Sequence, residues 1–333
     1  MTAPTATTSL PGKTPQFERL RQRHAWKVVI VAIFAVMVGW RASQVPVFAG
    51  FEIRTITAGA LAVALLARAP GVVVISGGIN MAVGSLLVLV NCIAAKYMEG
   101  QGFVTCLLIA VGCLVVSAAL SGLMGWIINV SHVPDIVVTL ALSFTFTGAA
   151  WLVIRGPGGG ADPTFKNMLV GGFSDPLPSI IVMVVVLAAI WYPFSRSRSG
   201  LAMYAMGSSK QTAFLAGVDV ASTRVKVYLL SGVFAGLAGL VTTAYTGGGE
   251  PRASIGLSVL MSSVAAAVLG GISLSGGTGG LFGPVIAAMV LGLIPAILMG
   301  IGLDPNYAEV VRGVIIIIVV MIGGMLQMRR RAT

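Results

Sequence analysis

Charged residues are scarce in this chain, and the places from which they are missing exclude several classes of function. Only 9% of the 333 residues are Asp, Glu, Lys or Arg, whereas a soluble domain carries about 25%. No Asp or Glu falls at the centre of an apolar run. Carriers coupled to ions or protons need ionisable groups inside the membrane, so this absence argues against them. His24 and His132 stand alone without an HExxH motif, which argues against an intramembrane metalloprotease.

Cysteine and nucleotide-binding motifs are also nearly absent. Cys92, Cys106 and Cys113 fall in or beside apolar runs, at a spacing that matches no metal or redox motif, so we interpret them as packing residues. The glycine-rich stretch 270–280 lacks the Lys-Ser/Thr of a P-loop and follows no soluble strand. We therefore expect a close-packed turn there, with no bound nucleotide, cofactor or metal and no enzymatic activity in this chain.

What the chain has instead is apolar sequence. Hydrophobic residues make up 57% of it, the mean hydropathy is +0.98, and runs of about 20 apolar residues recur along its length. These runs predict an all-α polytopic membrane protein with a cytoplasmic tail at 1–26, one transmembrane domain at 27–327 and a basic tail at 328–333. We expect ten spans, at about 27–45, 54–68, 82–98, 103–129, 134–154, 178–195, 226–246, 256–271, 280–301 and 310–327.

The distribution of charge predicts the orientation of these spans. With the N-terminus inside, the inner segments hold 14 Lys and Arg against three acidic residues, so they carry the whole formal charge of +11. The outer ends hold seven cations and seven acids and are neutral. Cytoplasmic loops favour Lys and Arg, so the pattern predicts that both termini lie inside. It also explains the high isoelectric point without a nucleic-acid partner.

One inner segment, 196–226, is too long for an ordinary connection between packed helices. Within it, Ser209 is suited to cap a short helix from Lys210 to Ala216, which Gly217 would end. That helix would carry Phe214 and Leu215 on one side, with Lys210 and Gln211 near its start. Two interpretations are open: the helix docks in a groove of a soluble subunit, or it lies on the lipid surface.

Two further segments combine glycine with irregular sequence, and a pair of glycines lies within the predicted span 226–246. After Pro70 and Gly71, which are expected to break a helix, the stretch 76–85 forms either a hairpin lining a pathway, with Asn80 as its hydrogen-bonding group, or a tight cytoplasmic turn. The outer loop 156–178 either receives a soluble binding protein or is a flexible linker. Gly232 and Gly236 suit close helix packing, and we expect an internal contact in preference to a dimer contact.

Three sequence elements resemble one family. SGLAMYAMGSSKQTA at 199–213, followed by LAGV at 215–218, resembles the inner loop of ribose/xylose-type ABC importer permeases. SGGINMAVGS at 76–85 is similar to that family's Gly-Gly-Ile-Asp-Leu-Ser-Val-Gly-Ser element. VAAAVLGG at 264–271 with GGTG at 276–279 is similar to a third element, and all three stand in the family's order within about 50–325.

The resemblance implies an architecture and a set of partners. Two permease subunits form one pathway in the bacterial inner membrane, a cytoplasmic ABC ATPase docks on each, and a periplasmic or lipid-anchored binding protein delivers the solute. ATP and magnesium belong to the ATPase, and the membrane lipid surrounds the permease. The resemblance also favours docking over the lipid interpretation of the inner loop. The expected coupling residues are Gly207, Ser209, Lys210, Gln211, Phe214, Leu215, Gly217 and Val218.

Some positions depart from the family. Asn80 stands where an Asp is usual, Met81-Ala82 replaces Leu-Ser, and Leu260-Met261-Ser262 replaces Glu-Leu-Asp. Leu201 stands where an Arg is usual. Two acidic positions are thus neutral here, so either the solute is atypical for the family or the partner permease of a heterodimer keeps the acids.

A pathway for a sugar should be uncharged and should offer hydroxyl, amide and aromatic groups. The residues that we expect to line it are Asn80, Met81, Ser85, Asn91, Thr139, Ser143, Phe144 and Thr145. A nucleoside or branched-chain amino-acid permease is an alternative, but an amino acid would need a positive group facing its carboxylate, and the sequence places no cation at a span centre. A channel or facilitator that works without ATP is another, and it leaves the 196–226 loop unexplained.

Overall fold

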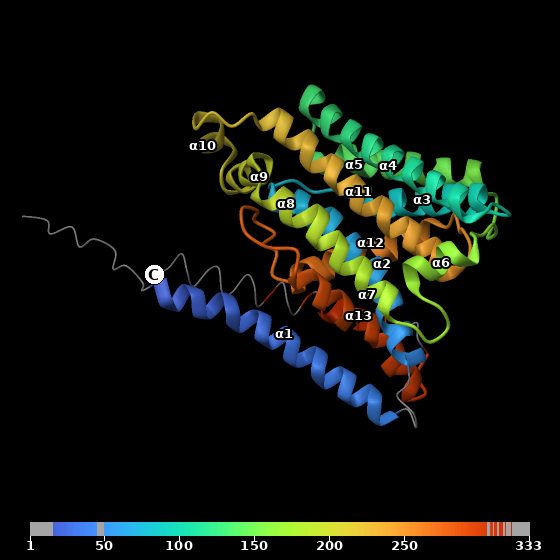
Figure 1. Ribbon diagram of the computed structural model, residues 1–333. Helices are drawn as coiled ribbons and strands as arrows, with labels where there is room; N and C mark the ends of the chain where they lie inside the picture. Colours follow the sequence, from blue (N-terminus) through green and yellow to red (C-terminus); the bar gives the residue numbers. More distant parts are fainter. Residues whose placement is uncertain are drawn as a thin grey trace, which may run out of the picture.

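The chain folds into a bundle of roughly parallel and antiparallel helices (Figure 1). The computed structural model describes residues 16–44, with side chains from residue 30, residues 50–304, and single positions between 307 and 321. The long helices are α1 (Gln16–Gln44), α2 (Gly50–Ile75), α3 (Val83–Met98), α4 (Phe103–Ser131), α5 (Asp135–Val153), α11 (Val220–Thr246), α12 (Ala253–Leu269) and α13 (Gly283–Gly300). A composite helix is formed by α7 (Leu177–Val186), the π-helical turn η1 (Leu187–Trp191) and α8 (Tyr192–Arg196).

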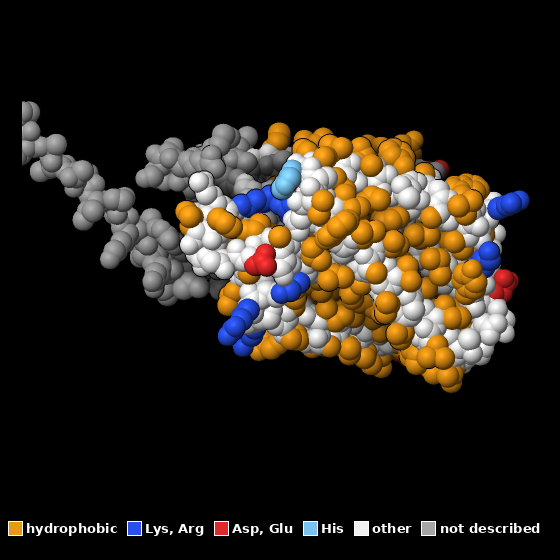
Figure 2. Space-filling model, turned by 90° about the horizontal axis from the view of Figure 1, so that it is seen from above, with side chains coloured by type: hydrophobic (Ala, Val, Ile, Leu, Met, Phe, Trp, Pro, Cys, Tyr) orange, Lys and Arg blue, Asp and Glu red, His pale blue; other side chains and the backbone are white. Residues whose placement is uncertain are grey.

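The predicted all-helical membrane class agrees with the described residues, which contain no strand. Six helices are long and apolar enough to cross a membrane, and three shorter apolar helices cover 30–44, 83–98 and 253–269. Figure 2 shows hydrophobic side chains over the middle of one face, with charged side chains near its two ends. This arrangement is typical of an apolar membrane band between two polar surfaces. The number of ten spans and their direction in the membrane stay predictions.

The centre of the bundle is built on α2 and α11, because the apolar windows of both are 78% buried, against 22% for α4, α5 and the α7–α8 unit. Glycine allows α11 to approach α4 closely. A Cβ atom on Gly236 would lie 3.0 Å from that of Ser117, and the Ser117 hydroxyl donates 2.7 Å to the carbonyl of Gly232. The predicted internal contact of these two glycines is therefore confirmed.

Connections that the predicted spans place on the same side of the membrane meet at the same end of the bundle. At one end, the 76–82 and 270–282 connections contact α9 (Arg198–Ser208). At the other, Gly158 and Gly249 exchange backbone hydrogen bonds of 2.8 and 3.1 Å. We call these the α10 end, after α10 (Lys210–Leu215), and the outer end (Figure 1).

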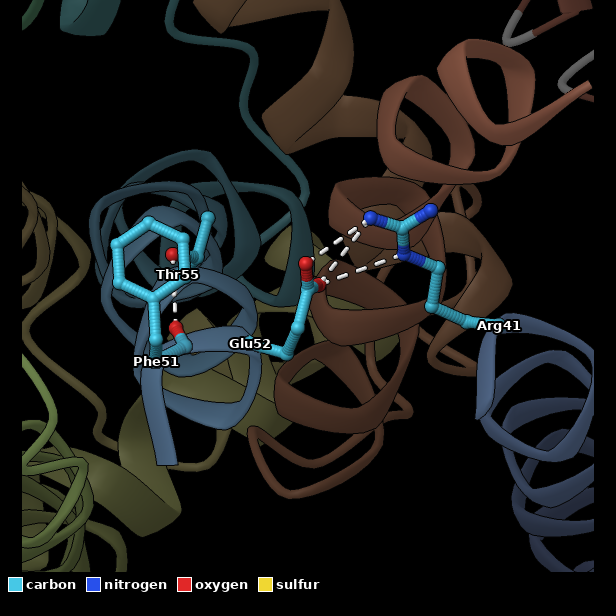
Figure 3. Close-up of polar contacts among 4 residues, drawn as sticks. All are labelled: Arg41, Phe51, Glu52 and Thr55. Carbon is cyan, nitrogen blue, oxygen red and sulfur yellow. Dashed lines mark hydrogen bonds and ion pairs between the residues drawn. The ribbon is translucent and has the colours of Figure 1, made fainter. Parts of the chain in front are cut away.

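An ion pair joins α1 to the bundle at the outer end. Arg41 Nη2 lies 3.1 Å from Glu52 Oε1 on α2, and its Nε also donates to Glu52 (Figure 3). In the same turn of α2, the Thr55 hydroxyl donates 2.9 Å to the carbonyl of Phe51. Both side chains of the pair are less than one-fifth exposed, so water screens their attraction less than it would on an open surface.

The break expected at Pro70 was wrong. Helix α2 continues through Pro70 and Gly71 to Ile75, and the chain leaves helical geometry only at 76–82. Proline removes one backbone hydrogen bond, but neighbouring helices hold a buried segment in place and other groups satisfy the freed carbonyl. Here both residues are buried.

This longer helix moves Arg68 from a span end to the interior. Its side chain is fully buried, with Nη2 3.0 Å from Met183 Sδ and the guanidinium 5.9 Å from the Phe234 ring. The expectation that no cation lies among the central spans was therefore wrong. The side chain contacts the apolar groups of Met183 and Phe234 and lines neither of the two cavities described below.

Several predicted boundaries also need correction. The segment 196–226 is not a continuous loop, because it contains α9 and the start of α11 at Val220. Helix α1 begins at Gln16, so residues 16–26 extend a helix formed by Gln, Glu, Arg and Leu, which favour helices. The outer loop contains α6 (Pro163–Val170), capped by the Asp162 carboxylate and anchored by buried Phe165. Most of the tenth span and residues 1–15 and 328–333 lie outside the described part.

Candidate coupling surface and solute pathway

The short helix predicted in the inner loop is present as α10. The Ser209 hydroxyl accepts a hydrogen bond from the Thr212 amide at 3.2 Å and caps its start. Gly217 follows its end with φ of +80°, a conformation that glycine adopts without strain. Ala213 faces inward, while Phe214 and Leu215 are 69% and 78% exposed. The helix thus holds two apolar side chains away from the bundle.

A groove runs beside these side chains. It measures about 570 Å³ and is lined from α4, the loop after it, the α10–α11 connection and the first turn of α11; the lining residues are Asn129, His132, Phe214, Gly217, Val218, Asp219, Val220, Ala221 and Arg224. Lys210 and Gln211 are exposed at the start of α10. We call α10 together with this groove the coupling surface. By this definition it contains six residues of the predicted coupling set, Lys210, Gln211, Phe214, Leu215, Gly217 and Val218.

Gly207 connects this surface to the interior. A Cβ atom on Gly207 would lie 2.6 Å from the Gly277 amide nitrogen and closer still to the carbonyl oxygen of Ile75. The Gly277 amide donates 2.8 Å to that same carbonyl, and Gly77 packs on the Gly207 backbone. Because only a residue without a side chain allows three backbones this close, we call Gly77, Gly207 and Gly277 the glycine junction.

The junction joins the three sequence elements that carry the family resemblance. Gly77 belongs to the first, Gly207 to the inner loop and Gly277 to the third. The Tyr204 hydroxyl adds a 2.9 Å hydrogen bond to the carbonyl of Gly279. The three elements thus meet at one place, at the α10 end of the bundle.

Asn80 and Thr139 hold the turn between α2 and α3. Asn80 Nδ2 donates 3.3 Å to the Ser231 hydroxyl, and its Oδ1 accepts from the Ala82 amide at 3.0 Å. Thr139 Oγ1 accepts from the Met81 amide at 3.1 Å and donates 2.8 Å to the carbonyl of Asp135. These hydrogen bonds join the turn to α5 and α11, so Asn80 and Thr139 shape the turn.

The remaining predicted pathway residues are dispersed. Ser85 is buried and donates 2.9 Å to the carbonyl of Ala82. On α5, Phe144 is 72% exposed, and Ser143 and Thr145 bond to carbonyls of their own helix. Asn91 lies near the outer end, apart from all of these, in a second cavity. The structure thus brings Asn80, Met81, Ser85 and Thr139 together and leaves Asn91 and the α5 group separate.

Sequence reasoning missed three residues of the turn and its surroundings. Tyr228 donates 3.3 Å to the Asp135 carboxylate, and the Ser231 hydroxyl donates 2.8 Å to the carbonyl of Ala69. Their spacing of three residues places both on one face of α11, which is a readable signal. No sequence pattern indicated that Arg68 is buried, because the predicted span 54–68 ends at this residue.

No metal site emerges within the part of the chain that the structure describes, since no three His, Cys, Asp or Glu side chains gather there. The expectation that this chain binds no cofactor stays a prediction.

The comparisons with known proteins identify the family. Residues 51–320 match the family described as branched-chain amino acid transport system / permease component. The chain is 30% identical over 264 residues to the ribose import permease protein of Escherichia coli K12, covering 78% of this chain and 81% of the relative. It is 33% identical over 247 residues to the D-allose transport system permease protein of the same strain, covering 73% and 74%.

A fructose import permease protein of Rhizobium meliloti is 29% identical over 305 residues, covering 89% of this chain and 82% of the relative. No solved structure matches the chain. The matched length and the apolar helices also show a multi-pass protein of the bacterial inner membrane. The chain belongs to the monosaccharide ABC importer permease family.

Proposed function

We propose that this chain is the membrane-spanning subunit of an ATP-driven importer for a monosaccharide or a related polar solute such as a polyol. It has no ATP-binding site of its own, pairs with a second permease subunit, and works with a cytoplasmic ABC ATPase and a solute-binding protein. The names of its relatives support the solute class, since they include ribose, D-allose and fructose import permeases.

The observation that carries the proposed coupling is the exposure of Phe214 and Leu215 on a capped helix beside a groove. Apolar side chains held out at a polar end of a membrane protein favour a protein partner, because helices of this kind bind in apolar grooves. The glycine junction then supplies a rigid route from α9 to the two turns. Closure of the ATPase on ATP would move α9 and α10 as one body and switch access between the two sides.

Affinity purification from native membranes in mild detergent tests the proposal, with ATPase activity measured on the eluate. We expect the wild-type chain to bring an ATPase with it and Phe214→Asp to lose it. The matched control is Phe173→Asp, the same change at an exposed position of the outer end, where a cytoplasmic partner cannot reach; this variant should retain the ATPase.

A wild-type chain that purifies alone and moves solute in liposomes without ATP would overturn the proposal. It would favour the alternative of a facilitator that works without ATP. Loss of the ATPase from both variants would show a folding defect, and the surface would then be mapped with Leu215→Ser, which introduces no charge.

A further inference from the structure

A small cavity at the outer end has the dimensions and chemistry of a solute site. It measures about 180 Å³ and lies between α3, the end of α11, the start of α12 and the turn after α5; its lining includes Leu87, Val88, Thr242, Thr246, Glu250 and Ile255. Pockets for drug-sized ligands measure about 300–1,000 Å³. This cavity therefore suits a smaller molecule, of the size of one sugar ring.

Asn91 builds the cavity, and both hydrogens of its amide are used within the protein. Its Nδ2 donates to Thr243 Oγ1 at 2.9 Å and to the carbonyl of Gly248 at 3.0 Å. Its Oδ1 accepts from the Glu250 amide at 3.1 Å. The amide thus clamps the 247–250 turn, which the Gly158–Gly249 hydrogen bonds hold from the other side. This clamp fixes where Glu250 lies.

The polar groups of the cavity that can still bond to a ligand are mostly hydrogen-bond acceptors. The Thr242 hydroxyl donates 2.8 Å to the carbonyl of Ala238, and that of Thr246 donates to the carbonyl of Thr242 or of Gly248, at 2.8 and 2.9 Å. Each hydroxyl has a single proton, so both keep lone pairs for an incoming donor. The Glu250 carboxylate, whose Oε1 is buried and paired with Arg252, adds further acceptor capacity.

The charge of the cavity is balanced at its edge. Glu250 forms an ion pair with Arg252, and the two side chains are 31% and 62% exposed. Because Arg252 already offsets the charge of the carboxylate, a cationic ligand is attracted less strongly there than at an isolated acid. An anionic ligand is repelled by Glu250. A neutral molecule that carries several O–H donors and a C–H surface for Leu87, Val88 and Ile255 fits both the hydrogen bonding and the charge.

We propose that this cavity, which we call the Glu250 pocket, is an outer subsite that holds one neutral polyhydroxylated solute before it enters the pathway. The inference rests on the proposed function and extends it, since it assigns recognition to Thr242, Thr246 and Glu250. Asn91 acts as a positioning residue through the 247–250 turn. No sequence pattern groups these residues, because they come from two helices and a turn.

Protection of an introduced cysteine tests the pocket without relying on transport. Thr246→Cys in the complete transporter is treated from the outer side with a charged, membrane-impermeant thiosulfonate. D-ribose, D-fructose and myo-inositol are each tested at millimolar concentration, and putrescine serves as the cationic comparison. The three native cysteines are buried, so the background should be low. The matched control is Ser174→Cys, at an exposed position of the outer end away from the pocket.

We expect at least one of the neutral solutes to protect Thr246→Cys, no solute to protect Ser174→Cys, and putrescine to have no effect. Adding Glu250→Gln, which keeps the size of the side chain, should raise the concentration needed for half-protection about tenfold, because a charge-assisted hydrogen bond becomes a neutral one. Asn91→Leu should weaken protection as well, and Thr246→Trp should lower solute uptake by filling the pocket.

Two failures can be told apart. If the wild-type complex takes up neutral solutes with ATP, but none of them protects Thr246→Cys and Glu250→Gln changes nothing, the pocket is overturned and the proposed function stands. If the wild-type complex takes up none of them, the proposed function fails. Protection by putrescine alone would assign the pocket to cations and would also overturn the inference.

Discussion

Gly207→Ala is the substitution that most directly tests the route from the coupling surface to the interior. The added methyl group would lie 2.6 Å from the Gly277 amide nitrogen, whereas ordinary van der Waals contact begins at 3.4 Å. The obstructing backbone atoms belong to the end of α2 and to the 270–282 connection, and they cannot rotate away as a side chain can. The Ile75 carbonyl oxygen would lie closer still, so the backbones must separate by more than about 1 Å, and overpacking of this kind costs about 1–3 kcal/mol.

The expected result is a complex that still assembles but couples poorly. The Gly277 amide would lose its 2.8 Å hydrogen bond to Ile75, so movement of α9 would no longer reach both turns together. ATPase activity should persist while solute uptake in proteoliposomes falls at least severalfold. Thermal unfolding of the purified complex, followed by tryptophan fluorescence, should show a lower midpoint.

Gly112→Ala is the matched control, because Gly112 lies within α4 and a Cβ atom there would meet nothing within 4 Å. It should leave uptake unchanged and stabilise the helix slightly, by no more than about 1 kcal/mol. Equal uptake and equal unfolding midpoints for Gly207→Ala, Gly112→Ala and the wild type would refute the close approach of the three backbones.

Three further predictions concern single contacts. Ser209→Ala removes the cap of α10 and should destabilise that helix by about 1 kcal/mol, measured as faster amide exchange at 210–215 and weaker retention of the ATPase. Tyr228→Phe removes the hydroxyl bonded to Asp135 and should lower the free energy of unfolding by about 1 kcal/mol; a value unchanged within error would show that the bond is not formed. Arg68→Met replaces a fully buried cation that has no carboxylate partner among the described residues, so the unfolding midpoint should rise or stay level, and a large fall would show that Arg68 has a partner.

Local chemistry explains which features could be predicted from the sequence. The cap at Ser209 and the stop at Gly217 act within a few residues, so the short helix could be placed to within one residue. The internal contact of Gly232 and Gly236 follows from their spacing on one helix face. The apolar runs likewise predict the helical class, and the three sequence elements at 76–85, 199–218 and 264–279 predict the family.

The other features depend on packing between distant segments. Pro70 stays helical because its neighbours in space bury it, which no local pattern reveals. The glycine junction joins positions 77, 207 and 277, and the Glu250 pocket joins α3 to a turn about 160 residues later. Single residues such as Asn91 could be recognised as polar groups in apolar helices, but their partners, and hence their roles, could not.

The glycine junction has a consequence for building hybrid transporters. A loop could be grafted from another permease to make this one accept a foreign ATPase. The graft would place the donor's residue at position 207, and the distance from that residue to the neighbouring turns would be the donor's. Since Gly207 touches Ile75, Gly77 and Gly277 through backbone atoms, the recipient turns would have to match the donor loop. The three segments therefore form one exchangeable module, and grafts of 196–219 that leave out 75–78 and 273–280 should assemble with the new ATPase and yet fail to transport.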